Sequence, residues 1–325
     1  AIARSIRIVA ALSPGPVAPS VAAGWWIAVG RAVTAPRAGV GPRGTIVHPS
    51  HPAERARSTC RLASNGGAAL RSCQKGGGAG ESERRIGRAL EGRRDRWVIS
   101  TKFGYRVGPN GTREDDSSPE TILPSLEGSL NRLGTDYIDV YLYHCAPQPE
   151  TIEAGMAVLD EAKARGKIRA YGISTGRLPV LESMVQRGAV EVVQFPSSLL
   201  DEKRDFWTIA REHDLGTQVR GVMAQGRLSG KYFGRQPRFD PDDNRSQWQR
   251  DVDFERYSVL ADCLPEGTTM AQAAIRWTLD HPGCHTVCLG AKNIDDYRTA
   301  LAAAEMPPLD ETVRSALERS AALLA

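Results

Sequence analysis

The feature that most limits the fold of this chain is a regular alternation that begins near residue 81. Short apolar runs typical of buried strands alternate with longer segments whose apolar residues recur at the helical period. The strand-like runs cover residues 97–101, 137–143, 168–173, 191–195, 218–223 and 284–289. Helices are expected at 82–94, 118–134, 150–166, 178–188, 203–214, 268–281, 294–304 and 309–324. Strands separated by helices run parallel, because tight hairpins join only antiparallel neighbours.

The number of strand–helix units leaves two barrel strands to be found. Six units follow residue 81, and a closed α/β barrel has eight. The missing strands must come from residues 1–80, where 24–30 and 44–49 are the best candidates. An open doubly wound sheet is the alternative, but no G-x-G-x-x-G loop stands between a strand and a helix. We therefore predict an α/β fold, a (β/α)8 TIM barrel whose first two βα units are degraded or atypical.

The first 80 residues differ from the rest in composition. They hold ten Lys and Arg and one acidic residue, Glu54, and carry +9, whereas the remainder carries −5. We predict an atypical basic segment at 1–77, nominally the first barrel strands, and a barrel at 78–325. The segment also suits a disordered basic arm. Its arginines are scattered singly without aromatic neighbours, so we expect no specific nucleic-acid partner.

The cysteines and the apolar runs bear on metal and compartment. The six cysteines form no C-x-x-C motif and no His/Cys cluster at zinc-ligand spacing, so we predict no metal and a reduced, cytoplasmic protein. An early apolar run of five residues is cut by SPGP, which does not fit a signal peptide. No run approaches the roughly 20 apolar residues of a membrane span, so we expect no membrane partner.

Two neighbouring strand-like runs end in polar residues that suit catalysis. Lys102 closes WVISTKF and His144 closes YIDVYLYH. In an α/β barrel the active site lies at the C-terminal ends of the strands. Neighbouring strands lie about 4.8 Å apart, so an ammonium and an imidazole there would share one pocket. Either residue alone could be structural, but two adjacent strands that end this way favour a catalytic pair.

Seven segments in order carry a family resemblance: WVISTKFGY, LNRLGTDYIDVYLYH, GKIRAYGIST, VVQFPSSLLD, GVMAQGRLSGKY, AQAAIRWTLDHPG and CLGAKNIDDY. Over residues 78–325 the chain resembles the aldo-keto reductase superfamily, in its bacterial long-chain branch. The resemblance implies a (β/α)8 barrel that binds NADP(H) across its mouth. It also implies an NADPH-dependent oxidoreductase that moves hydride between the nicotinamide and an aldehyde, ketone or sugar carbonyl. The expected partner is therefore a small carbonyl compound.

The resemblance assigns catalytic roles to the same two residues. The family's tetrad is Asp, Tyr, Lys and His, and Lys102 and His144 match the last two. Hydride attack leaves an alkoxide, which needs hydrogen-bond donors and an acid. In the family a tyrosine is that acid, and since its pKa is near 10 in water, an ammonium must stabilise the phenolate. The histidine orients the carbonyl.

The resemblance also implies the cofactor contacts. The family's Ser-Asn pair and glutamine for the nicotinamide carboxamide fall on Ser174, Thr175 and Gln194, and its stacking aromatic falls on Arg220, a departure. Asp296 and Ala300 replace the family's Gln and Asn for the adenine, a further departure. The cation in GAK would favour a 2′-phosphate and hence NADPH. The assigned cofactor residues are Ser174, Thr175, Gln194, Arg220, Ser229, Gly230 and Lys231 for the nicotinamide and pyrophosphate, and Gly290 and Lys292 for the adenosine end.

The family's Asp and Tyr are absent. Counting back from GESERRIG places the tyrosine at Gly77 and the aspartate at Ser72, and residues 1–80 contain no Asp and no Tyr. Three explanations stay open: residues from about 30 to 77 translate a wrong reading frame, the chain has become a nucleotide-binding or regulatory protein with little catalysis, or another acid such as His144 or Tyr105 serves. We favour the first, which predicts a D-x-x-x-x-Y motif in another frame of the gene and a sheet with exposed edges.

Overall fold

The structure is a computed structural model that describes residues 6–13, 24–31, 68–72, 80–107, 113–239, 246, 249, 251–291 and 293–324. Its strands are β1 (Ile6–Ser13), β2 (Gly24–Arg31), β3 (Ala68–Ser72), β4 (Trp97–Phe103), β5 (Tyr105–Val107), β6 (Arg113–Asp115), β7 (Ile138–Tyr143), β8 (Ile168–Ser174), β9 (Val192–Pro196), β10 (Gly216–Arg220) and β11 (Thr286–Ala291). Its α-helices are α2 (Glu81–Leu90), α3 (Pro119–Leu133), α4 (Ile152–Ala164), α5 (Leu178–Gln186), α6 (Arg204–Glu212), α8 (Met270–Asp280), α9 (Ile294–Glu305) and α10 (Glu311–Ala322).

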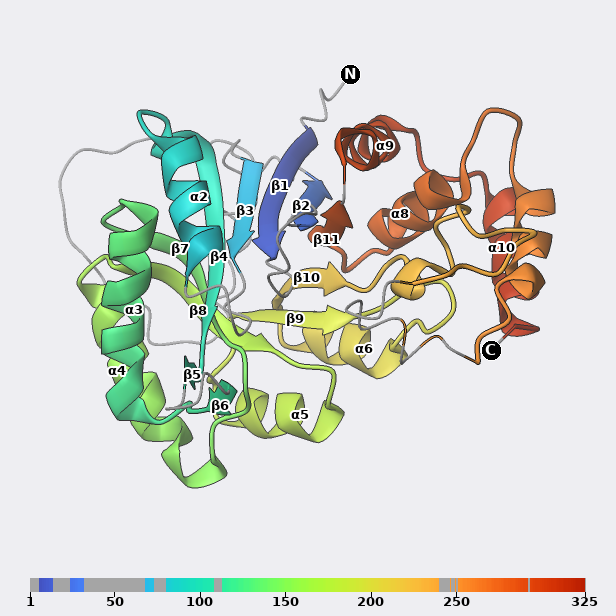
Figure 1. Cartoon of the computed structure of the whole chain (residues 1–325). Helices are drawn as coiled ribbons and strands as arrows, with labels where there is room; N and C mark the ends of the chain where they lie inside the picture. The colour runs from blue at the N-terminus through green and yellow to red at the C-terminus, as the bar shows by residue number, and fades with distance from the viewer. Residues whose placement is uncertain are drawn as a thin grey trace, which may run out of the picture.

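The described strands close into a barrel. The order around the ring is β1-β2-β11-β10-β9-β8-β7-β4-β3, and β3 pairs with β1 to close it. Strand β2 runs antiparallel to both of its neighbours, and the other strands of the ring run parallel to one another. All six strands predicted after residue 81 are present, and helices follow them in sequence. The predicted α/β TIM barrel is therefore confirmed (Figure 1).

The strands from the first 80 residues differ from those predicted. Residues 24–31 form a strand, but it is the antiparallel one, and 44–49 lie outside the described residues. The parallel strands are instead Ile6–Ser13 and Ala68–Ser72. The expectation of exposed sheet edges is wrong, because these strands complete the ring. Strand pairing uses backbone groups that every residue except proline carries in full, so a segment with weak side-chain patterning can still close a sheet.

Alternate residues of the strands separate two buried layers. Phe103, Tyr141 and Tyr143 belong to the main core, which also contains Ile122 and Leu126 of α3. Val140, Leu142, Ala170 and Val192 form a separate cluster on the opposite face of the strands, inside the barrel. Figure 1 shows α2, α3 and α4 grouped outside β4 and β7, whereas α8, α9 and α10 lie beyond β11. None of the helices in the described parts is both long and apolar enough to cross a membrane.

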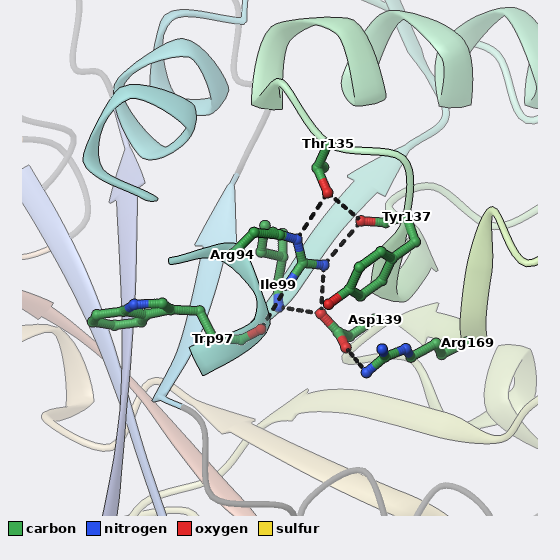
Figure 2. A network of polar contacts seen from close by, with 7 residues as sticks. All are labelled: Arg94, Trp97, Ile99, Thr135, Tyr137, Asp139 and Arg169. Atoms are coloured by element: carbon green, nitrogen blue, oxygen red, sulfur yellow. Dashed lines mark hydrogen bonds and ion pairs between the residues drawn. The ribbon is translucent and has the colours of Figure 1, made fainter. Parts of the chain in front are cut away.

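A charged network ties together the N-terminal ends of three strands (Figure 2). The Asp139 carboxylate on β7 is fully buried and accepts hydrogen bonds from Arg94 at 2.7 Å, Arg169 at 2.8 Å and the backbone N–H of Ile99 at 2.8 Å. Arg94 also donates to the carbonyls of Trp97 and Tyr137. Both guanidinium groups lie over the Tyr137 ring, at 3.9 and 4.2 Å. The network fixes β4, β7 and β8 side by side at the end opposite the expected site.

Candidate active site

Lys102 lies inside the barrel near the C-terminal end of β4. It is 3% exposed and pairs in register with Leu142 of β7, which belongs to the interior cluster. Residues paired in register point to the same face of a sheet. The side chain of Lys102 therefore faces the interior. A buried ammonium near the C-terminal end of a barrel strand makes Lys102 a candidate catalytic residue.

His144 follows the last residue of β7. Its backbone N–H donates to the Phe103 carbonyl at 2.8 Å, which continues the β4–β7 pairing by one step. It stands two residues beyond Leu142 and so shares the interior face with Lys102, about 7 Å further along the barrel axis. The imidazole packs against the Tyr105 ring, with centroids 4.3 Å apart and planes inclined at 56°. The structure thus brings Lys102 and His144 to one end of the barrel and adds a phenol.

A chain of neutral side chains crosses the barrel beside these residues. Ser174 Oγ donates to Gln194 Oε1 at 2.8 Å, and Gln194 Nε2 donates to Gln218 Oε1 at 2.8 Å. Gln218 and Ser100 exchange hydrogen bonds at 3.2 Å. All four residues are buried, so these dipoles satisfy one another away from water. We call Ser100, Ser174, Gln194 and Gln218 the polar chain.

Thr175 and Arg220 border the polar chain at the C-terminal ends of β8 and β10. The Thr175 backbone N–H donates to the Gln194 carbonyl at 2.9 Å, and its hydroxyl accepts from the Arg177 N–H at 3.0 Å. Arg220 is partly exposed, and its guanidinium approaches Gly176 across the end of β9: a Cβ added at Gly176 would lie 3.7 Å from its Nη2. This places a cation at the rim, where a bound anionic group would meet it.

The remaining predicted cofactor residues lie further around the rim. Ser229 caps its own loop, donating to the Gly226 carbonyl at 2.6 Å and accepting from the Lys231 N–H at 3.3 Å. The Lys231 ammonium pairs with Asp296 of α9 at 2.5 Å, which links the loop of Ser229, Gly230 and Lys231 to that helix. Gly290 is exposed in β11. Lys292 lies outside the described residues, as does Gly77, the position of the family's tyrosine.

Sequence reasoning missed two members of the polar chain. Ser100 and Gln218 sit within strands rather than at strand ends, so the rule that drew attention to Lys102 and His144 passed over them. The available signal was alternation: Ser100 stands two residues before Lys102, and Gln218 two before Arg220, so each shares the face of a predicted site residue. Applying the period of two to each strand would have found both.

The residues present fit a nicotinamide cofactor. A carboxamide has both donors and an acceptor, and the amide of Gln194 and the hydroxyl of Ser174 offer both roles. Arg220 and Lys231 supply positive charge at the rim, where a pyrophosphate needs it.

Comparison with known proteins agrees with this geometry. Residues 53–322 match the Aldo/keto reductase family. The NADH-specific methylglyoxal reductase of Escherichia coli is 28% identical over 69% of this chain and 74% of that protein. Among solved structures, the holo form of an aldo-keto reductase from Bacillus halodurans has a TM-score of 0.67, 27% identity, and coverage of 82% of this chain and 86% of that one. A glycerol dehydrogenase from Gluconobacter oxydans has a TM-score of 0.69, 25% identity, and coverage of 85% and 88%. The chain belongs to the aldo/keto reductase family, whose members are oxidoreductases.

Proposed function

We propose that this protein is an NADPH-dependent oxidoreductase that reduces an aldehyde or ketone carbonyl, or oxidises the corresponding alcohol. The observation that carries the proposal is the shared interior face of Lys102, one residue before the end of β4, and His144, one residue after the end of β7, next to the polar chain. A buried ammonium and an imidazole at one point suit a reaction that places negative charge on an oxygen atom.

The side chains have separate roles in this proposal. The reduced nicotinamide supplies the hydride when bound. Ser174 and Gln194, which now bond each other, would hold its carboxamide. His144 donates a hydrogen bond to the substrate carbonyl, and Lys102 stabilises negative charge near it. Inside the barrel, the apolar cluster of Val140, Leu142, Ala170 and Val192 keeps bulk water from the inner wall.

The preference for NADPH rests on charge at the adenosine end. Lys292 follows β11 directly and would meet a 2′-phosphate. The carboxylate of Asp296 on α9 would repel a 2′-phosphate. Its ion pair with Lys231, at 2.5 Å, offsets part of that negative charge. Two relatives show that both cofactors occur near this sequence: one is named NADH-specific and another NADP(+)-dependent. We propose NADPH because Asp296 is already paired.

A nucleotide-binding protein without turnover is the second candidate. The observation that favours it is the absence of Asp and Tyr from residues 1–80, because losing a general acid costs about 10² to 10⁴ in rate. Such a protein would keep the polar chain and Lys231 and would bind the nucleotide as tightly as the enzyme.

One experiment separates the two. The full chain is titrated with NADPH and with NADH while its tryptophan fluorescence is followed, and each nucleotide is then tested for oxidation at 340 nm against small aldehydes, ketones and aldoses. Quenching with turnover supports the proposed enzyme, and tighter binding of NADPH supports the cofactor assignment. Quenching with no turnover above a no-protein control selects the second candidate, and no quenching overturns both.

The Lys102→Met variant is the matched check on the site. It removes the charge while keeping an unbranched apolar side chain inside the barrel. We expect it to lower kcat with little change in NADPH affinity, whereas Lys203→Met, at the partly exposed residue that precedes α6, should change neither.

A further inference from the structure

The proton donor is what the proposed function lacks. The chain has eight tyrosines and none precedes Tyr105. All eight lie in the part of the chain that the structure describes. Their positions therefore decide which phenol can reach a carbonyl held beside Lys102 and His144.

Four tyrosines on or next to the strands point away from the site. Tyr141 and Tyr143 are fully buried in the outer core against the helices, and burial raises the pKa of both phenols. Tyr171 also faces outward, where its hydroxyl donates to Asp160 at 2.9 Å. Tyr137 lies at the opposite end of β7 within the charged network. None of them lies inside the barrel mouth.

Three further tyrosines belong to other parts of the molecule. Tyr232 and Tyr257 pack on Phe254, with ring centroids 5.3 and 6.5 Å from it. Tyr297 lies in α9 on the outside of the barrel, and burial raises the pKa of its phenol. Tyr105, whose ring contacts the His144 ring, is left as the candidate.

The backbone explains why Tyr105 lies there. Gly104 has φ +103°, a conformation that disfavours side chains, and a Cβ added to it would lie 2.6 Å from Ser117 Oγ and 3.4 Å from the Cys145 nitrogen. The chain can thus turn in contact with the end of β7 directly after β4. The next residue, Tyr105, pairs with Asp115 in the β5–β6 hairpin, and the Asp116 N–H donates to the Gly104 carbonyl at 2.9 Å.

We propose that Tyr105 is the proton donor of this enzyme, in place of the family's missing tyrosine; the inference rests on the proposed function. In reduction, the carbonyl carbon receives a hydride with its electron pair from C4 of the dihydronicotinamide. The carbon–oxygen π pair moves to the oxygen, which takes the proton from the Tyr105 hydroxyl. The products are the alcohol, the oxidised cofactor and a Tyr105 phenolate that water reprotonates. Besides this one solvent proton, the cycle needs no further reactant.

The charges around Tyr105 act in both directions. Lys102 at the end of β4 and His144 after β7 favour a phenolate when they are cationic. Asp115 across the hairpin and Asp116 beside it disfavour one. Arg106 is already engaged with Glu114 at 2.9 Å and Asp116 at 3.7 Å. The hydroxyl of Ser118 and then its N–H lower the pKa of Asp116, so that carboxylate stays charged. The proposal requires Lys102 to outweigh the carboxylates.

An absorbance titration tests the proposal without any turnover. Phenolate formation is followed at 295 nm as pH rises in the full chain with NADP+ bound. We expect one tyrosine to ionise before the others, to be lost in Tyr105→Phe, to shift upward in Lys102→Met, and to persist in Tyr137→Phe. The proposal is overturned if Tyr105→Phe keeps the early ionisation and loses only a tyrosine that ionises late.

Kinetics give a second readout. Tyr105→Phe removes a single oxygen from a partly exposed ring, and we expect kcat to fall by about 10² to 10⁴ while the NADPH dissociation constant stays within about twofold. Tyr137→Phe should keep both values. If Tyr105→Phe keeps the wild-type kcat, the proposal is overturned while the enzyme assignment stands, and another group supplies the proton. If wild type binds NADPH but never turns over, the enzyme assignment fails, and the titration alone decides whether Tyr105 is an activated phenol.

Discussion

The two ends of the barrel hold their polar groups in different ways. At the N-terminal end, the fully buried Asp139 carboxylate has both oxygens engaged, by Arg94 and Arg169, and is bonded to backbone as well (Figure 2). Toward the C-terminal end, the polar chain runs from Ser100 to Ser174 through two neutral amides. The first set is charged and closed on itself, whereas the polar chain is neutral and lies beside Lys102 and His144.

This difference separates stability from function. A buried charge must be fully paired, because removing one partner leaves the other charge buried and unpaired, at a large cost in free energy. A ligand therefore cannot replace a contact within the charged network without destabilising the fold. Neutral hydrogen bonds are worth about 1 kcal/mol each, and a ligand that offers equivalent groups can replace them at little cost. In α/β barrels the N-terminal face generally serves stability and the C-terminal face serves chemistry.

The largest effect is expected at the charged network. Asp139→Asn leaves Arg94 and Arg169 without their carboxylate, and we expect the free energy of unfolding to fall by about 3 kcal/mol. The estimate is at the low end for buried pairs because Arg169 is 46% exposed. Urea unfolding followed by circular dichroism measures it, and NADPH affinity of the folded protein should not change.

The matched control is an exposed ion pair on a nearby helix. Glu161→Gln breaks the ion pair with Arg165. The side chain of Glu161 is 53% exposed and that of Arg165 is 64% exposed, so the free energy of unfolding should fall by no more than about 0.5 kcal/mol. If Asp139→Asn costs as little as Glu161→Gln, the N-terminal network does not hold the barrel and the contrast between the two ends is wrong.

The next effect is expected at the centre of the polar chain. Gln218→Leu removes the acceptor of Gln194 Nε2 and the partner of Ser100, and leaving buried groups unsatisfied should cost about 2 kcal/mol. Adding Ser100→Ala to Gln218→Leu should recover part of the lost stability, because the double variant no longer contains the unsatisfied Ser100 hydroxyl. Chemical unfolding of the single and double variants measures both. A loss as large as that of Asp139→Asn would show that the neutral chain is as structural as the charged network.

The fold after residue 81 was predictable because its strands are buried on both faces. Such strands read as continuous apolar runs, for example VYLY at residues 140–143, and the helices between them keep a clear period. In the first 80 residues the strands were hard to predict. For example, β3 is the five-residue AALRS, which has too few large apolar residues to show alternation. The position of β2 beside β11 depends on a pairing between segments far apart in the chain, which no local pattern encodes.

The site was predictable where chemistry and position coincided. Lys102 and His144 interrupt apolar strands at their ends, so each one stands out. Gln218 lies inside a strand, and its role emerges only when β9 and β10 are paired in register. The contact of Tyr105 with His144 depends on the turn at Gly104 and on the tight approach of Ser117, a tertiary effect that a single sequence does not reveal.

A smaller effect, on binding rather than folding, is expected at Ser174. Ser174→Ala removes one hydroxyl from the proposed nicotinamide site, and a lost hydrogen bond of about 1 kcal/mol raises the NADPH dissociation constant about fivefold. Fluorescence titration measures it. Ser183→Ala, whose hydroxyl accepts from the exposed Arg187, should leave affinity unchanged. Equal affinity of Ser174→Ala and wild type would remove Ser174 from the cofactor site.

The smallest effect is expected from pH at the N-terminal end. Burial lowers the pKa of His285, an effect that nearby Asp214 partly opposes, and its Nδ1 accepts from the Thr217 N–H at 3.2 Å. The folded protein therefore binds this proton less readily than the unfolded chain, so stability falls as pH drops below about 6.5, the ordinary value for histidine. His285→Asn keeps an acceptor but cannot titrate, so its free energy of unfolding should change less between pH 7 and pH 5, measured by urea unfolding. His281, whose pKa burial also lowers, leaves a residual slope in the same direction. An unchanged slope in His285→Asn would mean that the N-terminal end does not exclude a charged imidazole.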